Sequence, residues 1–358
     1  MDSEIWSKLP VEILDHILTF LPLKSLLILA STCRHFHSLL SSPAFASRAD
    51  CRSRLSPSSS AFLVLSHPHS HRHHFRLYDS LLGSWRSSPL PSSSSSALLL
   101  STSNSLFCFS LPSSSAFLIS NLLTRSSRLI PFPSLPFSAS SFELLSFVST
   151  PASGYRILAS SSRSSPAFLY DSRSLSWRRF DSFNLRLSRS RLGEGVYFEE
   201  NFYFATSDRH PVSRFDPESG VVERCGRGLE LLENELTFCR LVSDGERRLF
   251  LVGGVGPNGI SRGVKVWVRA GDGWAETERV PEMICRKLMS VCYHNYEHVY
   301  CLWHQGMICI CCYTWPEVLY YRESRGTWHW LPKCPSLPEK WSCGFRWYSF
   351  LPEISATV

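Results

Sequence analysis

The chain has 358 residues, enough for one large domain or for an ordinary domain and a small one. Apolar residues make up 44% and charged residues 19%, a balance that supports a sizeable core and excludes a largely disordered chain. The net charge of +7 is uneven, because residues 51–192 hold 15 arginines, no lysine and only 4 acidic residues, whereas both flanking segments carry a slight excess of acid.

The first 45 residues have the apolar spacing of short helices. Pro10 opens a segment in which Ile13, Leu14, Ile17, Leu18 and Leu21 recur at helical intervals, and Pro22 ends it. Two further short runs follow, over 23–30 and from about residue 31 to residue 40. A unit this small buries little of its own surface. Its many leucines must therefore either cap a neighbouring domain or enter a partner's groove.

The same residues resemble the F-box. Leu9-Pro10, Ile13-Leu14, Leu21-Pro22, Leu26, Cys33-Arg34-x-Phe36 and Pro43-x-Phe45 follow in the order and spacing of that family's motif, with Phe36 where tryptophan is usual. The resemblance implies a three-helix domain over residues 1–48 that docks onto a Skp-type adaptor and, through it, a cullin. The residues it implies for adaptor binding are Leu9, Pro10, Ile13, Leu14, Ile17, Leu18, Leu21, Pro22, Leu26, Cys33 and Phe36.

A linker over 49–60 leads into a segment of short apolar runs separated by Ser, Gly, Pro and Asp clusters, which is typical of strands and turns. No helical period is evident after residue 50. One strand recurs six times and ends near a turn at positions 79, 121, 171, 216, 268 and 322, twice in the form Tyr-Asp followed by a tryptophan. Repeats of about 45–50 residues match the blade of a β-propeller.

Each unit should contribute further strands. A second strand is expected at 62–65, 106–109, 155–158, 202–204, 249–252 and 299–302, and an upstream strand at 97–100, 144–147, 238–241 and 291–293. The aspartate should cap its turn, and the tryptophan should pack between blades. Because the first unit lacks an upstream strand, the final run 345–350 should complete it and close the ring.

These repeats resemble worn kelch motifs, with Gly253-Gly254 followed by Trp274 as the clearest mark. Together with the F-box, they indicate a plant-type F-box/kelch protein. The expected fold is therefore a small all-α N-terminal domain followed by an all-β propeller over 61–352, with six blades and a short tail at 353–358.

Other candidate sites have simpler explanations. The histidine-rich loop 67–74 lacks fixed geometry for a metal, and Cys309, Cys311 and Cys312 lie in a strand-like run that predicts core packing. The acidic clusters at 194–200 and 230–235 are expected at loops or edges rather than as a glycosidase pair. We expect no metal, no cofactor, no nucleic-acid partner and no membrane partner. The scattered cysteines favour a reduced cytoplasmic or nuclear protein.

Three functional hypotheses remain open. The first is a non-catalytic substrate receptor of a Skp–cullin–F-box ubiquitin ligase, whose propeller binds an unidentified protein substrate. Arg186, Arg189 and Arg191 are weak candidates for contacts to an acidic substrate. The second is a propeller enzyme, a hydrolase or an oxidase, with a helical cap. The third is an adaptor-binding protein that acts outside the ligase, for example in transcription.

Overall fold

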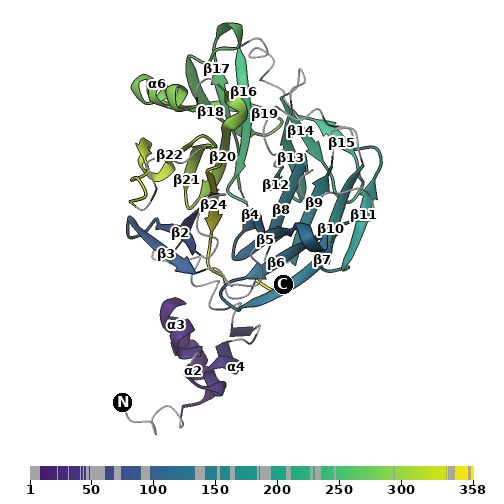
Figure 1. Cartoon of the computed structure of the whole chain (residues 1–358), viewed down its shortest axis with the longest axis vertical. Helices are drawn as coiled ribbons and strands as arrows, with labels where there is room; N and C mark the ends of the chain where they lie inside the picture. Colours follow the sequence, from purple (N-terminus) through teal and green to yellow (C-terminus); the bar gives the residue numbers. More distant parts are fainter. Residues whose placement is uncertain are drawn as a thin grey trace.

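The computed structural model describes residues 9–21, 23–30, 32–40, 42, 44–45, 48, 61–67, 74–89, 97–133, 142–150, 154–161, 166–183, 185, 195–206, 211–225, 229, 235–245, 247–292, 295–335, 337, 343–353 and 356–358. A group of short helices at the N-terminal end lies outside a ring of sheets (Figure 1). These helices are α2 (Val11–Leu18), α3 (Leu23–Ala30) and α4 (Arg34–Leu40). No helix in the described part of the chain is long and apolar enough to cross a membrane.

The ring consists of six four-stranded antiparallel sheets, which confirms the six-bladed propeller. In each blade the strands follow one another as A, B, C and D from the innermost strand to the outermost. Blade one contains β24 (Arg346–Phe350), β1 (Phe62–Ser66), β2 (His74–Asp79) and β3 (Ser84–Pro89). Blade two contains β4 (Leu98–Ser103), β5 (Leu106–Leu111), β6 (Ala116–Asn121) and β7 (Ser126–Pro131). Blade three contains β8 (Leu144–Thr150), β9 (Gly154–Ser160), β10 (Ala167–Asp171) and β11 (Ser176–Phe180).

The remaining blades complete the circle in chain order. Blade four contains β12 (Val196–Phe198), β13 (Asn201–Ala205), β14 (Val212–Phe215) and β15 (Val222–Arg224). Blade five contains β16 (Leu236–Ser243), β17 (Leu249–Val255), β18 (Gly263–Ala270) and β19 (Gly273–Arg279). Blade six contains β20 (Val299–His304), β21 (Met307–Cys312), β22 (Trp315–Arg322) and β23 (Thr327–Trp330). Short 3-10 turns lie at Pro112–Ser114, Pro257–Gly259, Tyr296–His298 and Glu323–Arg325.

The last strand closes the ring, as the sequence predicts. β24 pairs antiparallel with β1, with Phe62 opposite Phe350 and Ser66 opposite Arg346. The inner strand of blade one therefore comes from the opposite end of the chain, and β1 is paired along both of its edges. His304 of blade six then bonds Ser349 of β24 through Nδ1 and the hydroxyl, 2.9 Å apart.

The repeated turn and tryptophan act as expected. Asp79 accepts hydrogen bonds from the amides of Leu81 and Leu82, and aspartates 171 and 216 cap the equivalent turns of blades three and four. Trp85 donates its indole N–H to the Pro332 carbonyl of blade six, and Trp177 donates to the Pro131 carbonyl of blade two. Each ring therefore joins two neighbouring blades.

The connection between blades five and six corrects two expectations. Residues 282–291 form a helix, α6 (Glu282–Val291), so the strand expected at 291–293 and the absence of helix after residue 50 are both wrong. The run 299–302 belongs to the innermost strand β20, and β21 takes the place expected for it. Pro281 precedes the helix, while Cys285, Leu288 and Met289 form its buried face against blades five and six.

The residues after β24 stay in contact with the ring. The Ser105 hydroxyl donates to the carbonyls of Leu351 and Glu353, 3.0 and 2.7 Å away, and the Asn121 amide donates to the Ala356 carbonyl at 2.7 Å. Ala356 and Val358 also pack against the apolar cluster between blades two and three. Residues 353 and 356–358, which belong to the segment 353–358 expected as a tail, therefore link the end of blade one to blades two and three.

Candidate functional site

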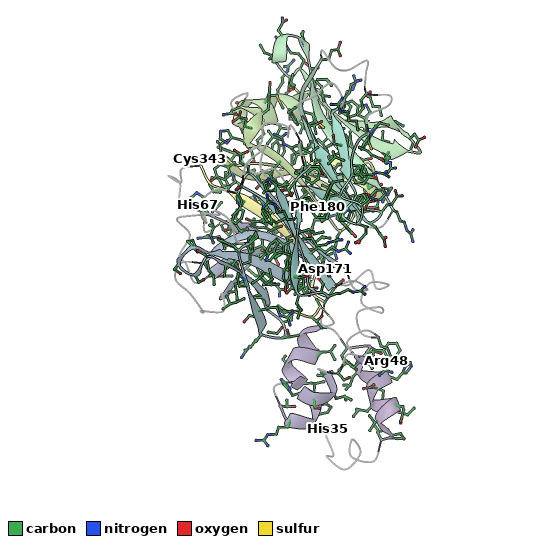
Figure 2. The ribbon with its side chains drawn as sticks, turned by 90° about the vertical axis from the view of Figure 1, so that its right-hand side faces the viewer. His35, Arg48, His67, Asp171, Phe180 and Cys343 are labelled. Atoms are coloured by element: carbon green, nitrogen blue, oxygen red, sulfur yellow. The ribbon has the colours of Figure 1, made fainter. Side chains whose placement is uncertain are left out.

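The helical unit has a small core of its own. Leu14 and Leu18 of α2, Leu26 of α3, Leu40 of α4 and Phe45 are buried against one another. Asp15, also buried, pairs with Arg48, so the end of this unit is held to its first helix. Figure 2 shows Arg48 and His35 within the helical unit, apart from the ring. The unit thus folds on its own contacts rather than as a cap inserted into the propeller.

The same helices expose an unusual amount of apolar surface. Ile13, Ile17 and Phe20 are 49, 38 and 64% exposed, and they follow at intervals of four and three residues, so they lie on one side of α2 and its continuation. Val11 and Ile28 are also exposed. An apolar stripe exposed on so small a unit is typical of surfaces that contact another protein. We call Ile13, Ile17 and Phe20 the α2 stripe.

The structure divides the residues that the sequence proposes for adaptor binding. Pro10, Ile13, Ile17 and Cys33 are exposed. Leu9, Leu21 and Phe36 are half-buried, and Pro22 lies outside the described residues. Leu14, Leu18 and Leu26 are buried in the core, where they support the exposed surface instead of forming it. Phe20 is missed by sequence reasoning because it follows the helix, although its spacing from Ile17 would have suggested it.

The propeller has two different faces. Because consecutive strands run in opposite directions, the A–B and C–D connections meet at one face, the turn face, and the B–C and D–A connections meet at the other, the loop face. The connections of the turn face are tight, such as 104–105, 199–200 and 305–306. The loop face holds the long D–A connections, which include 181–195, 225–235, 280–298 and 331–345, beside B–C connections that are as short as 313–314. The chain enters the ring at the start of β1 and leaves it at the end of β24, and both of these points lie at the turn face.

Ion pairs join neighbouring blades along the turn face. Arg156 of blade three reaches Glu218 of blade four at 3.2 Å, and Arg269 of blade five reaches Glu199 of blade four at 3.1 Å. Arg248 of blade five forms a two-pronged pair with Glu323 of blade six. These charges are used for cohesion between blades. Glu199 therefore lies at a turn, as expected, and pairs with an arginine instead of a second carboxylate.

The loop face is the side suited to variable recognition, since long loops on a rigid scaffold commonly carry binding function. Arg186, Arg189 and Arg191 lie outside the described residues. In the sequence they fall between Leu185 and Gly195, the described residues that follow β11 of blade three and precede β12 of blade four. Their contact with a substrate stays a prediction. Figure 2 shows His67 and Cys343, which flank two other loop-face connections, on the same side of the ring.

His67 and the cysteine-rich strand pack inside the propeller. His67 is buried with its ring 4.7 Å from that of Phe345, while residues 68–73 lie outside the described part. Cys309, Cys311 and Cys312 are buried in β21, which confirms core packing, and burial raises the pKa of each thiol. No group of three or more potential metal ligands occurs among the residues that the structure describes.

Buried charge is the feature that the sequence does not indicate. Arg240 of β16 is buried and donates to the carbonyls of Val299, Cys239 and Tyr296 at 2.5, 2.6 and 2.6 Å. Desolvation lowers its pKa. Two of these carbonyls belong to the segment that starts blade six, so the guanidinium fastens blades five and six beside α6. Because its hydrogen-bond partners are carbonyls of the protein itself, we assign Arg240 a role in holding the two blades together.

Comparison with known proteins agrees with this architecture. Residues 6–48 match the family model of the F-box domain. Over 372 aligned residues, covering 100% of this chain and 90% of the relative, the chain is 49% identical to the F-box/kelch-repeat protein At5g43190 of Arabidopsis thaliana. The chain belongs to the F-box/kelch-repeat family. Another Arabidopsis thaliana family member, F-box/kelch-repeat protein At3g61590, is 24% identical, with 92% of this chain and 85% of the relative covered.

The family assignment indicates what the helical unit and the propeller generally do in proteins of this kind. F-box domains generally bind Skp-type adaptors within cullin ligases. F-box/kelch proteins are typically non-catalytic adaptors in which the propeller accompanies this docking domain. An F-box with a kelch-type propeller suggests a substrate receptor, and this F-box/kelch chain has both components.

Proposed function

We propose that this F-box/kelch protein is the substrate-recognition subunit of a Skp–cullin–F-box ubiquitin ligase. The α2 stripe and the neighbouring Pro10 bind the Skp-type adaptor, and the loop face of the propeller holds a protein substrate. The chain itself makes and breaks no bond. It raises the effective concentration of substrate lysines near a charged ubiquitin carrier, working in the cytoplasm or the nucleus.

The observation that supports this proposal most is the α2 stripe. Ile13 and Ile17 are exposed on the helix that carries the F-box match, although Leu14 and Leu18 of the same helix are buried. Exposed isoleucines leave apolar area in water at about 25 cal/mol for each Å². A partner that covers the stripe recovers this free energy, and the separate core of the helical unit keeps the stripe in place without the partner.

The division of the propeller into two faces supports the second half of the proposal. The turn face holds tight turns, ion pairs between blades and the segment after β24, all of which are engaged in cohesion. The loop face carries the long connections. A substrate bound there meets the part of the ring whose sequence can vary without loss of the fold.

Co-purification of the adaptor tests the proposal. Full-length protein with Leu9→Ala and Pro10→Ala should lose the Skp-type adaptor and the cullin, while its thermal unfolding stays that of a folded propeller. A matched control is Met283→Ala, which removes an exposed apolar side chain from α6 on the propeller. This control should retain the adaptor. Undiminished adaptor binding by the double variant would contradict the proposed function.

A further inference from the structure

Lysine is almost absent from this chain, although the chain is rich in cations. Its 37 basic residues comprise 31 arginines and 6 lysines. Between Lys24 and Lys265 there are 25 arginines and no lysine. That interval contains α4, the three outer strands of blade one, all of blades two to four and the first two strands of blade five. Lysine ranks among the commonest residues of globular proteins, so its absence over such a length needs a cause.

Solubility and ion pairing do not explain the choice of arginine everywhere. Several arginines in the interval do use a forked guanidinium, as in the pair of Arg248 with Glu323. Others are exposed at the ends of blades, where either cation would serve. Arg125 lies in the C–D turn of blade two, and Arg224 at the end of the last strand of blade four. The chain uses arginine at both kinds of position.

The two cations differ in their chemistry toward an acyl donor. In ubiquitin transfer a lysine Nζ attacks the thioester carbonyl at the ubiquitin C-terminus. A C–N bond forms, the C–S bond to the carrier cysteine breaks, the thiolate leaves and the amine proton passes to a base. A deprotonated amine has the necessary lone pair, whereas the guanidinium stays protonated and delocalised. Arginine therefore supplies positive charge without an acceptor.

We infer that the lysine-free interval protects this F-box/kelch protein from ubiquitination within its own complex, an inference that rests on the proposed function. A receptor held near the ubiquitin carrier presents its own amines at the high effective concentration meant for the substrate. Replacing lysine by arginine over blades one to four removes those acceptors and preserves the charge. The assembled receptor then survives while the substrate is modified.

The described lysine ammonium groups are all paired with glutamate and confined to blades five and six. Lys265 lies 2.7 Å from Glu276 and its side chain is 18% exposed. Lys287 lies 2.6 Å from the buried Glu317 and 4.1 Å from the centre of the Trp330 ring, and is 44% exposed. Lys333 also reaches Glu317, at 3.3 Å, and is 78% exposed. Each of these three amines is thus engaged by a carboxylate, and Lys333 is the most accessible of the three.

The experiment is a reconstituted ubiquitination reaction with the full chain, the Skp-type adaptor, the cullin and its charged carrier. The test variant combines Arg125→Lys, Arg173→Lys and Arg224→Lys, three exposed positions on blades two, three and four. The matched control changes the same positions to glutamine, which removes charge and adds no amine. A lysine-bearing peptide joined to the N-terminus of each protein reports whether the complex transfers ubiquitin at all.

In the wild-type and glutamine-control reactions, ubiquitin should be attached to the joined peptide and very little to the receptor itself. The lysine variant should gain ubiquitin on the receptor several-fold faster, and mass spectrometry should locate it at the three new lysines. If the peptide is modified but the lysine variant gains ubiquitin no faster than wild type, the inference is wrong and the receptor function stands. Equally fast self-modification of the wild-type chain would also overturn the inference. Failure of the chain to assemble with the adaptor would instead contradict the proposed function.

Discussion

The buried histidine at the closure of the ring predicts a specific dependence of stability on pH. His304 is fully buried at the end of β20, and its Nδ1 bonds the Ser349 hydroxyl of the closing strand. Desolvation, assisted by the nearby Arg322 charge, lowers its pKa to about 3. In the unfolded chain the imidazole returns to a pKa of about 6.5. Between these values the unfolded state binds a proton that the folded state does not.

The sign and the magnitude follow from this difference. The contribution of His304 is fully present above pH 6.5 and is lost as the pH falls toward 3, because protonation favours the unfolded chain. Between pH 7.5 and pH 5 the folded imidazole stays neutral while the unfolded one becomes charged. The free energy of unfolding should therefore fall by about 2 kcal/mol from this group alone.

Urea unfolding at pH 7.5 and pH 5 measures the effect. His304→Asn keeps a polar atom near the position of Nδ1 and removes the titrating ring, so the loss of stability between the two pH values should shrink by about 2 kcal/mol. The matched control is Met307→Ala, since Met307 is buried opposite His304 in the strand pair and does not titrate. It should lower stability at both pH values and leave the difference intact. An unchanged difference in His304→Asn would refute the reasoning.

Three further predictions concern the cohesion of the ring. Deletion of residues 344–358 removes the buried Trp347, Tyr348 and Phe350. At about 3–5 kcal/mol for each large aromatic side chain, the loss of stability approaches the whole free energy of unfolding of a domain. Melting within a degree or two of the intact chain would show that β24 does not close the ring. Asn121→Asp keeps the side-chain oxygen that caps its own turn but loses the N–H that donates to the Ala356 carbonyl. Amide hydrogen exchange in residues 351–353 and 356–358 should therefore accelerate. Unaltered exchange would disprove this contact. Arg240→Met removes the donor to three carbonyls. At about 1–3 kcal/mol for each carbonyl that loses its hydrogen bond, it should cost at least about 3 kcal/mol in denaturant unfolding. A cost below about 1 kcal/mol would show that this guanidinium contributes little to joining blades five and six.

The regular part of this architecture is predictable from the sequence because it depends on local patterns that repeat. The Tyr-Asp to Trp hairpin sets both the turn and the contact between blades, and the missing first strand identifies the C-terminal strand as its replacement. Asn121 fits the same pattern, yet its amide is explained only by the segment after β24, which it binds. In blades one, three and four the equivalent residue is aspartate, whose carboxylate has no N–H to donate to a carbonyl.

Other features depend on contacts that exist only after the ring has closed. Arg240 and Val299, or Arg248 and Glu323, are far apart in the chain, and nothing in their local sequence relates them. The repeat pattern predicts a strand at 291–293 and so hides the helix α6, although Cys285, Leu288 and Met289 have helical spacing. In the F-box, the motif identifies the domain, but only the structure separates core leucines from the exposed stripe.

Direct titration of the purified chain with a purified Skp-type adaptor tests the central claim. Ile13→Ala with Ile17→Ala removes apolar area from the α2 stripe and leaves the core residues Leu14 and Leu18 in place. At about 1–2 kcal/mol for each interface side chain, the Kd should rise by about 30-fold to 1,000-fold. Met283→Ala on α6 should bind as the wild type does. An adaptor Kd that is the same for the double variant and the wild type would contradict the assignment of this surface as the docking site.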